Sequence, residues 1–143
     1  FNNMIELLYF ASQIQCGVGG ELLDIQVDIY HNQELVETMV VEDTVLLSVD
    51  SINDLTLEYS IINNNTSCSL ATPSELVLAP DDQLPDLAGF DQQDSVSTLL
   101  GSLNEYQELF LVELGTTNTN SSAFDLQDVT LRVDNNPISL FAD

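Results

Sequence analysis

Residues 23–41 read LDIQVDIYHNQELVETMVV, and this stretch decides the fold. In its first half every second residue is aliphatic, which is the period of a strand with one buried face. Residues 31–34 (HNQE) are typical of a turn, and residues 35–41 return as a valine-rich partner strand. The stretch therefore predicts an antiparallel hairpin with one apolar face and one wet, acidic face.

Similar short segments recur along the chain. Further strands are predicted at residues 44–49, 55–61, 75–79, 106–114 and 129–133, with an edge strand at residues 137–141. Residues 95–103 are compatible with a short helix. Leu126 and Val129 belong to apolar series of opposite parity, which predicts a bulge at Gln127 and Asp128.

This pattern predicts one all-β domain over residues 1–143. About eight or nine short strands, regular turn signals and no long helix are typical of an antiparallel β-sandwich. Its topology would be that of a jelly-roll or would be immunoglobulin-like. The chain has no stretch approaching the roughly 18 apolar residues of a membrane span, so we expect no membrane insertion.

The N-terminal segment, residues 4–14, is apolar on both parities. A strand buried on both faces belongs to the interior of a sandwich or to an interface between subunits. Two hypotheses follow for residues 1–15. They form the first strand of this domain's own core, or a donor strand that completes a neighbouring subunit's sheet, with residues 17–20 (GVGG) as its hinge.

Basic side chains are almost missing. Against 24 Asp and Glu stands one base, Arg132, and the formal net charge is −23. The chain therefore has no lysine for a Schiff base, no cationic clamp for phosphate and no basic face for nucleic acid. Such a surface suits a saline or calcium-rich exterior, where ions screen the carboxylates.

Two cysteines, Cys16 and Cys68, predict one disulfide, which fits an oxidising compartment. It would stabilise the fold by roughly 3–4 kcal/mol. The alternative is two buried thiols.

Five carboxylates fall within residues 80–94, and hard oxygen ligands on a loop suit calcium. The candidate ligands are Asp81, Asp82, Asp86, Asp91 and Asp94. Their spacing is not that of an EF-hand. A solvated acidic loop is the simpler alternative, and calcium is the one cofactor that the sequence indicates.

Three Asn-x-Ser/Thr sequons mark candidate glycosylation sites at Asn64, Asn65 and Asn120, all in polar, loop-like stretches.

Catalytic motifs are lacking. The single histidine, His31, falls in the predicted hairpin turn, and no nucleophile motif accompanies it. Paired carboxylates are the only catalytic chemistry that this composition supports, and the chain has no Trp to form a sugar platform. We therefore expect no enzymatic activity.

These observations favour a non-enzymatic extracellular or cell-surface protein with a structural or adhesive role. The leading hypothesis is a surface or filament subunit that self-associates into a homopolymer by β-strand pairing between subunits. The alternative is a carbohydrate- or ligand-binding β-sandwich module. Binding modules expose aromatic residues on one face, and the candidates are Tyr30, Tyr59, Phe90 and Tyr106.

Overall fold

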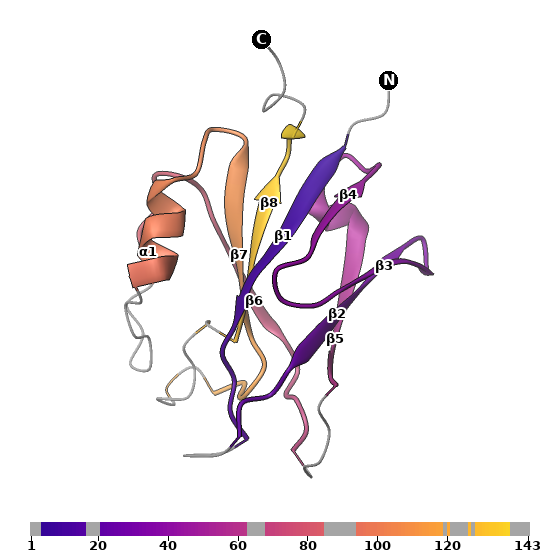
Figure 1. Ribbon diagram of the computed structural model, residues 1–143, viewed down its shortest axis with the longest axis vertical. Helices are drawn as coiled ribbons and strands as arrows, with labels where there is room; N and C mark the ends of the chain where they lie inside the picture. Colours follow the sequence, from indigo (N-terminus) through magenta and orange to yellow (C-terminus); the bar gives the residue numbers. More distant parts are fainter. Residues whose placement is uncertain are drawn as a thin grey trace.

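The structure is a computed structural model that describes residues 4–16, 21–62, 68–84, 94–118, 120, 126 and 128–137. Over this part the chain forms two antiparallel sheets, one of five strands in the order β4-β1-β8-β7-β6 and one of three in the order β3-β2-β5 (Figure 1). The predicted antiparallel β-sandwich is confirmed, with eight strands in the described ranges.

The elements agree closely with the sequence pattern up to residue 134, and residues 138–141 of the predicted edge strand lie outside the described residues. They are β1 (Ile5–Ser12), β2 (Ile25–His31), β3 (Glu34–Met39), β4 (Thr44–Leu47), η1 (Ile52–Asp54), β5 (Leu55–Ile61), β6 (Ser74–Leu78), α1 (Asp94–Gly101), β7 (Gln107–Glu113) and β8 (Val129–Asp134). None of the helices in the described ranges is long and apolar enough to cross a bilayer.

The β2–β3 hairpin forms where the sequence predicts it. Asn32 and Gln33 form its two-residue turn, with φ angles of 51° and 69°. Two successive positive φ angles match the right-handed twist of the flanking strands, and Asn tolerates this conformation better than most residues. The alternation continues through β2, where Ile25, Val27 and Ile29 are buried and the residues between them are half-buried.

The main core lies between the two sheets. Alternate residues of β1, β2 and β8 fill it, with support from β7 and β5. Tyr9 is fully buried there, and its hydroxyl donates to the Ile25 carbonyl at 2.9 Å. This hydrogen bond joins β1 of the larger sheet to β2 of the smaller one.

A second core covers the outer face of the five-stranded sheet. Helix α1 packs there through Val96, Leu99 and Leu100 against the outward-facing Leu109 and Leu111 of β7, at one side of the sandwich (Figure 1). Strand β7 is therefore buried on both faces.

This second core explains the change of parity near β8. Leu126 packs on the α1 side, whereas Val129, Leu131 and Val133 face the core between the sheets. Leu126 and the alternate residues of β8 thus serve two different cores, and their opposite parity does not require one bulged strand. Gln127, half of the predicted bulge, lies outside the described residues. Strand β8 begins at Val129. The residue before it, Asp128, donates its backbone N–H to Val112 O at 3.1 Å.

The same two cores account for the apolar N-terminal segment. Strand β1 is paired on both sides within its own chain, by β4 and by β8. Ile5, Leu7 and Tyr9 enter the main core, while Phe10 on the opposite face packs against the α1 cluster. In this structure β1 is thus an interior strand of the domain's own sheet.

The buried phenol of Tyr9 gives a prediction for alkaline pH. Burial raises its pKa to about 12, above the ordinary value of 10.0. A raised pKa means that its stabilising contribution is complete below pH 10 and is lost as the pH rises towards 12. We expect the contribution of Tyr9 to the free energy of unfolding to fall by roughly 2–3 kcal/mol over this window, as measured by urea denaturation of the parent and of a variant without this hydroxyl.

Tyr9→Phe is the control for this prediction. The variant loses about 1 kcal/mol at pH 7 with the hydrogen bond to Ile25, and it should lose less additional stability than the parent between pH 10 and 12. Equal losses in both proteins over this window would show that other groups drive the alkaline transition.

Candidate functional site

The predicted disulfide between Cys16 and Cys68 is confirmed, with a Cα–Cα distance of 5.9 Å. This distance is within the usual range for a disulfide. Cys16 follows β1, and Cys68 begins the segment that leads to β6. All three strands of the smaller sheet lie between the two cysteines along the chain.

The candidate calcium loop is only partly described. Asp81 and Asp82 are exposed in the turn after β6, and Asp82 Oδ2 accepts a hydrogen bond from Ala79 N at 2.8 Å. Asp86 and Asp91 lie outside the described residues, and the backbone of Asp94 begins α1. No three His, Cys, Asp or Glu side chains in the described ranges form a group that could hold a metal ion.

Of the three sequon asparagines, Asn64 and Asn65 lie outside the described residues. Asn120 is exposed, and its backbone N–H donates to Asn118 Oδ1 at 3.0 Å.

Two buried carboxylates meet at the end of β7. Leu114 N donates to Asp128 Oδ2 at 2.7 Å, and Gly115 N donates both to this atom at 3.0 Å and to Glu113 Oε2 at 2.7 Å. Glu113 also accepts from Leu126 N at 3.3 Å. A Cβ at position 115 would lie 3.0 Å from Glu113 Oε2, so this turn is built around a glycine. The pair accepts hydrogen bonds from backbone N–H groups and thereby fixes the turn at residues 114–116, directly after β7.

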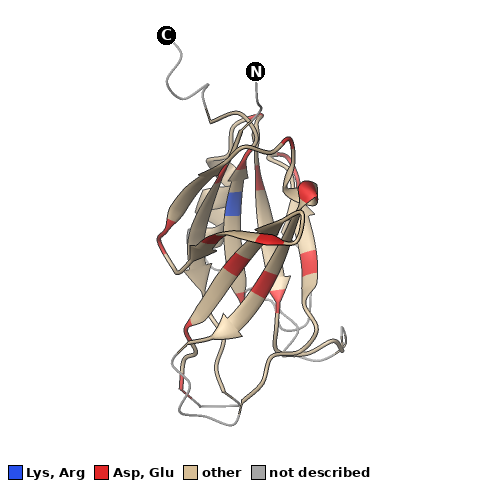
Figure 2. Ribbon diagram, turned by 90° about the vertical axis from the view of Figure 1, so that its right-hand side faces the viewer, with Lys and Arg blue, Asp and Glu red and all other residues tan. Residues whose placement is uncertain are grey.

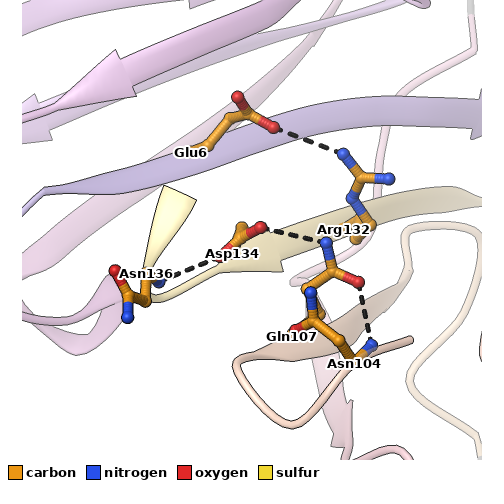
Figure 3. Close-up of polar contacts among 6 residues, drawn as sticks. All are labelled: Glu6, Asn104, Gln107, Arg132, Asp134 and Asn136. Carbon is orange, nitrogen blue, oxygen red and sulfur yellow. Dashed lines mark hydrogen bonds and ion pairs between the residues drawn. The ribbon is translucent and has the colours of Figure 1, made fainter. Parts of the chain in front are cut away.

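The single base lies in a region of two neighbouring groups of polar contacts on the five-stranded sheet, which we call the polar network (Figure 3). Arg132 of β8 pairs with Glu6 of β1 at 3.3 Å. Beside them, Gln107 Nε2 donates to the buried Asp134 at 2.9 Å, and Asn136 N donates to the same carboxylate at 2.9 Å. These contacts tie β1, β8 and β7 together and leave Arg132 engaged within the fold.

Most of the carboxylates outside this network lie on the molecular surface. Figure 2, which faces the smaller sheet, shows Asp and Glu distributed over its strands. Asp28 of β2 and Glu58 of β5 are directly opposite each other in the pairing register. Like charges in this position repel each other.

A groove of about 560 Å³ lies beside these two carboxylates. Five consecutive residues of β5, residues 56–60, line it together with Leu70, Ala71, Pro73 and Leu114. Tyr59 lies at this edge, and its hydroxyl donates to Glu75 of β6 at 3.2 Å. Burial, and then the Glu75 charge, raise the pKa of Tyr59 far above its ordinary value, so the phenol remains a donor.

The tyrosines do not form one aromatic platform in the described part of the chain. Tyr30 lies on the outer face of β2, where partial desolvation and the charges of Glu58 and Asp28 raise its pKa. Tyr59 packs partly against the main core, and Tyr106 is exposed in the turn before β7. Phe90 lies outside the described residues.

The opposite side of the sandwich exposes apolar residues. Strand β3 is the outer strand of the smaller sheet, and β4 is the outer strand of the larger one. We call their exposed side chains, with those of the connection between them, the apolar edge. It comprises Leu35, Val36, Val40, Val41 and Leu46.

No protein-family model matches the sequence, and no curated protein matches it. The candidate sites are therefore interpreted from their geometry alone. In the described residues, two surface features stand out: the apolar edge and the groove along β5. Sequence reasoning missed the groove, because it depends on which strands end each sheet.

Proposed function

We propose that the chain is a non-enzymatic extracellular structural protein, a surface or filament subunit that assembles by β-strand pairing between subunits. The apolar edge carries this proposal. Leu35 and Leu46 are 55% and 54% exposed on the two adjoining outer strands. An outer strand presents unpaired backbone groups, and an exposed apolar one pairs readily with another chain.

The usual protection of such an edge is missing. Natural sheets guard outer strands with lysine, proline or inward-pointing charges. Residues 34–47 contain neither lysine nor proline, and β4 has no charged residue at all. Acids at positions 34, 37, 42 and 43 are the only charges that oppose pairing there.

The position of β1 favours edge pairing over donor-strand exchange. Releasing β1 would break its ladders with both β4 and β8. The disulfide also holds Cys16, which precedes the GVGG segment, so in the oxidised protein a hinge at residues 17–20 could not free β1.

The disulfide supports an extracellular location, because such bonds persist mainly in oxidising compartments. The net charge of −23 makes association depend on ions, since subunits of like charge repel unless salt screens them. Calcium bound near Asp81 and Asp82 would likewise reduce the repulsion between subunits.

We therefore expect assembly to appear as ionic strength rises. The protein should be monomeric in about 0.01 M NaCl and oligomeric or filamentous in about 1 M NaCl, where the Debye length falls from about 30 Å to about 3 Å. Light scattering after size exclusion gives the mass, and electron microscopy shows whether the assemblies are regular. Loss of assembly with a chelator, at constant salt, would support calcium as the screening ion.

The matched variants are Leu35→Lys/Leu46→Lys and Leu22→Lys/Ile62→Lys. Both add two positive charges at exposed positions, but only the first pair alters the apolar edge. We expect the first pair to remain monomeric in high salt and the second to assemble like the parent. A parent that stays monomeric at every ionic strength, or an edge variant that still assembles, would contradict the proposal.

A further inference from the structure

The second outer strand of the smaller sheet, β5, has main-chain groups directed away from β2. Ile62 N donates to Asp24 O at 3.0 Å, one step beyond the register pair of Ile25 and Ile61. In an antiparallel ladder, alternate residues direct their N–H and C=O groups to the same neighbour. Residues 60, 58 and 56 therefore bond β2, whereas Leu57 and Tyr59 direct their backbone groups to the other side. Within the described residues no strand pairs with β5 there.

The groove described above runs along this side of β5. Its lining includes residues 56–60 in unbroken sequence, so it follows the strand rather than crossing it. Leu57, Leu70, Pro73 and Leu114 supply apolar lining. An extended segment could therefore insert apolar side chains among these residues while its backbone pairs with Leu57 and Tyr59.

The outer rim of the groove is acidic. Glu58 is exposed, and Asp28 lies opposite it on β2 with its Oδ1 accepting from Thr38 Oγ1 at 2.9 Å. Neither Lys nor Arg contributes to the lining. On a strand added beside β5, residues of the same parity as Glu58 would face these carboxylates, and a cation there would relieve their mutual repulsion.

The chain cannot supply such a strand from a second copy of itself. A complementary segment alternates apolar and basic residues, whereas this chain has one basic residue, Arg132, engaged with Glu6 in the middle of the larger sheet. Charge complementarity thus points to a different protein.

We propose that β5 binds an extended segment of a basic partner protein by antiparallel strand addition. Apolar residues of that segment enter the groove and exchange main-chain hydrogen bonds with Leu57 and Tyr59. Its alternate Lys or Arg residues lie over Asp28 and Glu58. This inference is independent of self-assembly, because it uses the opposite edge of the smaller sheet from β3.

The test uses a synthetic heptapeptide, acetyl-KVKVKVK-amide, and backbone amide exchange by NMR. We expect binding to slow exchange at Leu57 and Tyr59 by at least about tenfold, with little change at residues 56, 58 and 60, whose N–H groups already bond β2. A peptide N-methylated at its valines, and one of the same composition ordered KKKKVVV, should both bind weakly. Two results would overturn the proposal: either control peptide binding as tightly as KVKVKVK, or exchange slowed equally at all residues from 56 to 60. Both would indicate only general attraction of a basic peptide to an acidic surface.

The matched protein variants are Asp28→Asn/Glu58→Gln and Glu34→Gln/Glu37→Gln. Each removes two carboxylates from the smaller sheet, but the second pair lies on β3. The first pair should raise the dissociation constant of the peptide at about 0.1 M salt by roughly tenfold or more, and the second pair should raise it by less than about threefold. Glu58→Gln alone, which leaves the Asp28 hydrogen bonds intact, should weaken binding in the same direction. Equal losses from the two pairs, or no binding by the parent, would contradict the proposal.

Discussion

Replacing Cys16 and Cys68 together with serine is expected to lower the free energy of unfolding by about 4 kcal/mol. The two residues are 52 positions apart, and a cross-link of this length removes much conformational entropy from the unfolded chain. Both side chains are only half-buried, so serine can replace them without placing a hydroxyl in a sealed apolar site. Urea denaturation of parent and variant, both in the absence of reductant, measures the difference.

The position of the disulfide makes the effect specific. The cysteines enclose β2, β3, β4 and β5, so the bond closes the segment that contains the whole smaller sheet and the outer strand β4 of the larger one. The parent treated with reductant should match the double variant within error. A loss below about 1 kcal/mol would mean that the unfolded chain is already compact in this region, or that the folded bond is strained.

The smaller sheet could be predicted closely because β2 and β5 each turn alternate residues towards the core and β3 follows β2 in a hairpin. Strand β5 begins and ends at the residues that the alternation predicts, 55–61, and β2 with its turn follows the same rule. Burial decides this pattern, since it selects every second side chain. Strand β3 was recognised chiefly by its hairpin, because five of its six residues are exposed.

The larger sheet was harder to interpret because it serves two cores. Strand β7 and part of β1 are apolar on both faces, since α1 covers the outer face near Leu109 and Phe10. Nothing local in residues 95–103 shows which sheet their short helix will cover. Leu126 and Val129 have opposite parity because they too pack in different cores. From the sequence alone, this change of parity favours a bulge.

Among the candidate sites, some could likewise be predicted from the sequence and others depend on how the strands are arranged. The disulfide could be predicted because two cysteines allow only one intramolecular pair. The groove could not, since it needs β5 at the end of a sheet and Leu70, Ala71 and Pro73 beside it, both of which are tertiary facts. Asp28 and Glu58 each lie on the polar face of a predicted strand, but only the register brings them together.

Asp128→Ala is expected to lower the free energy of unfolding by about 3 kcal/mol, a large effect for an acid on so acidic a protein. Asp128 is 4% exposed, and its Oδ2 accepts from the buried Leu114 N at 2.7 Å. Alanine leaves that N–H buried without this acceptor, although Gly115 N keeps Glu113. The charged hydrogen bond and the cost of the orphaned donor both contribute to the loss.

Asp128→Asn separates the hydrogen bond from the charge. An amide oxygen can still accept from Leu114 N, while the repulsion between the carboxylates at positions 113 and 128 disappears. We therefore expect the asparagine variant to lose less than about 1 kcal/mol, and Asp81→Ala in the exposed turn to change stability by less than about 0.5 kcal/mol. Equal losses from alanine and asparagine would show that the negative charge itself is required there. That result would mean that the hydrogen bonds from Leu114 N and Gly115 N stabilise the turn mainly because their acceptor is charged.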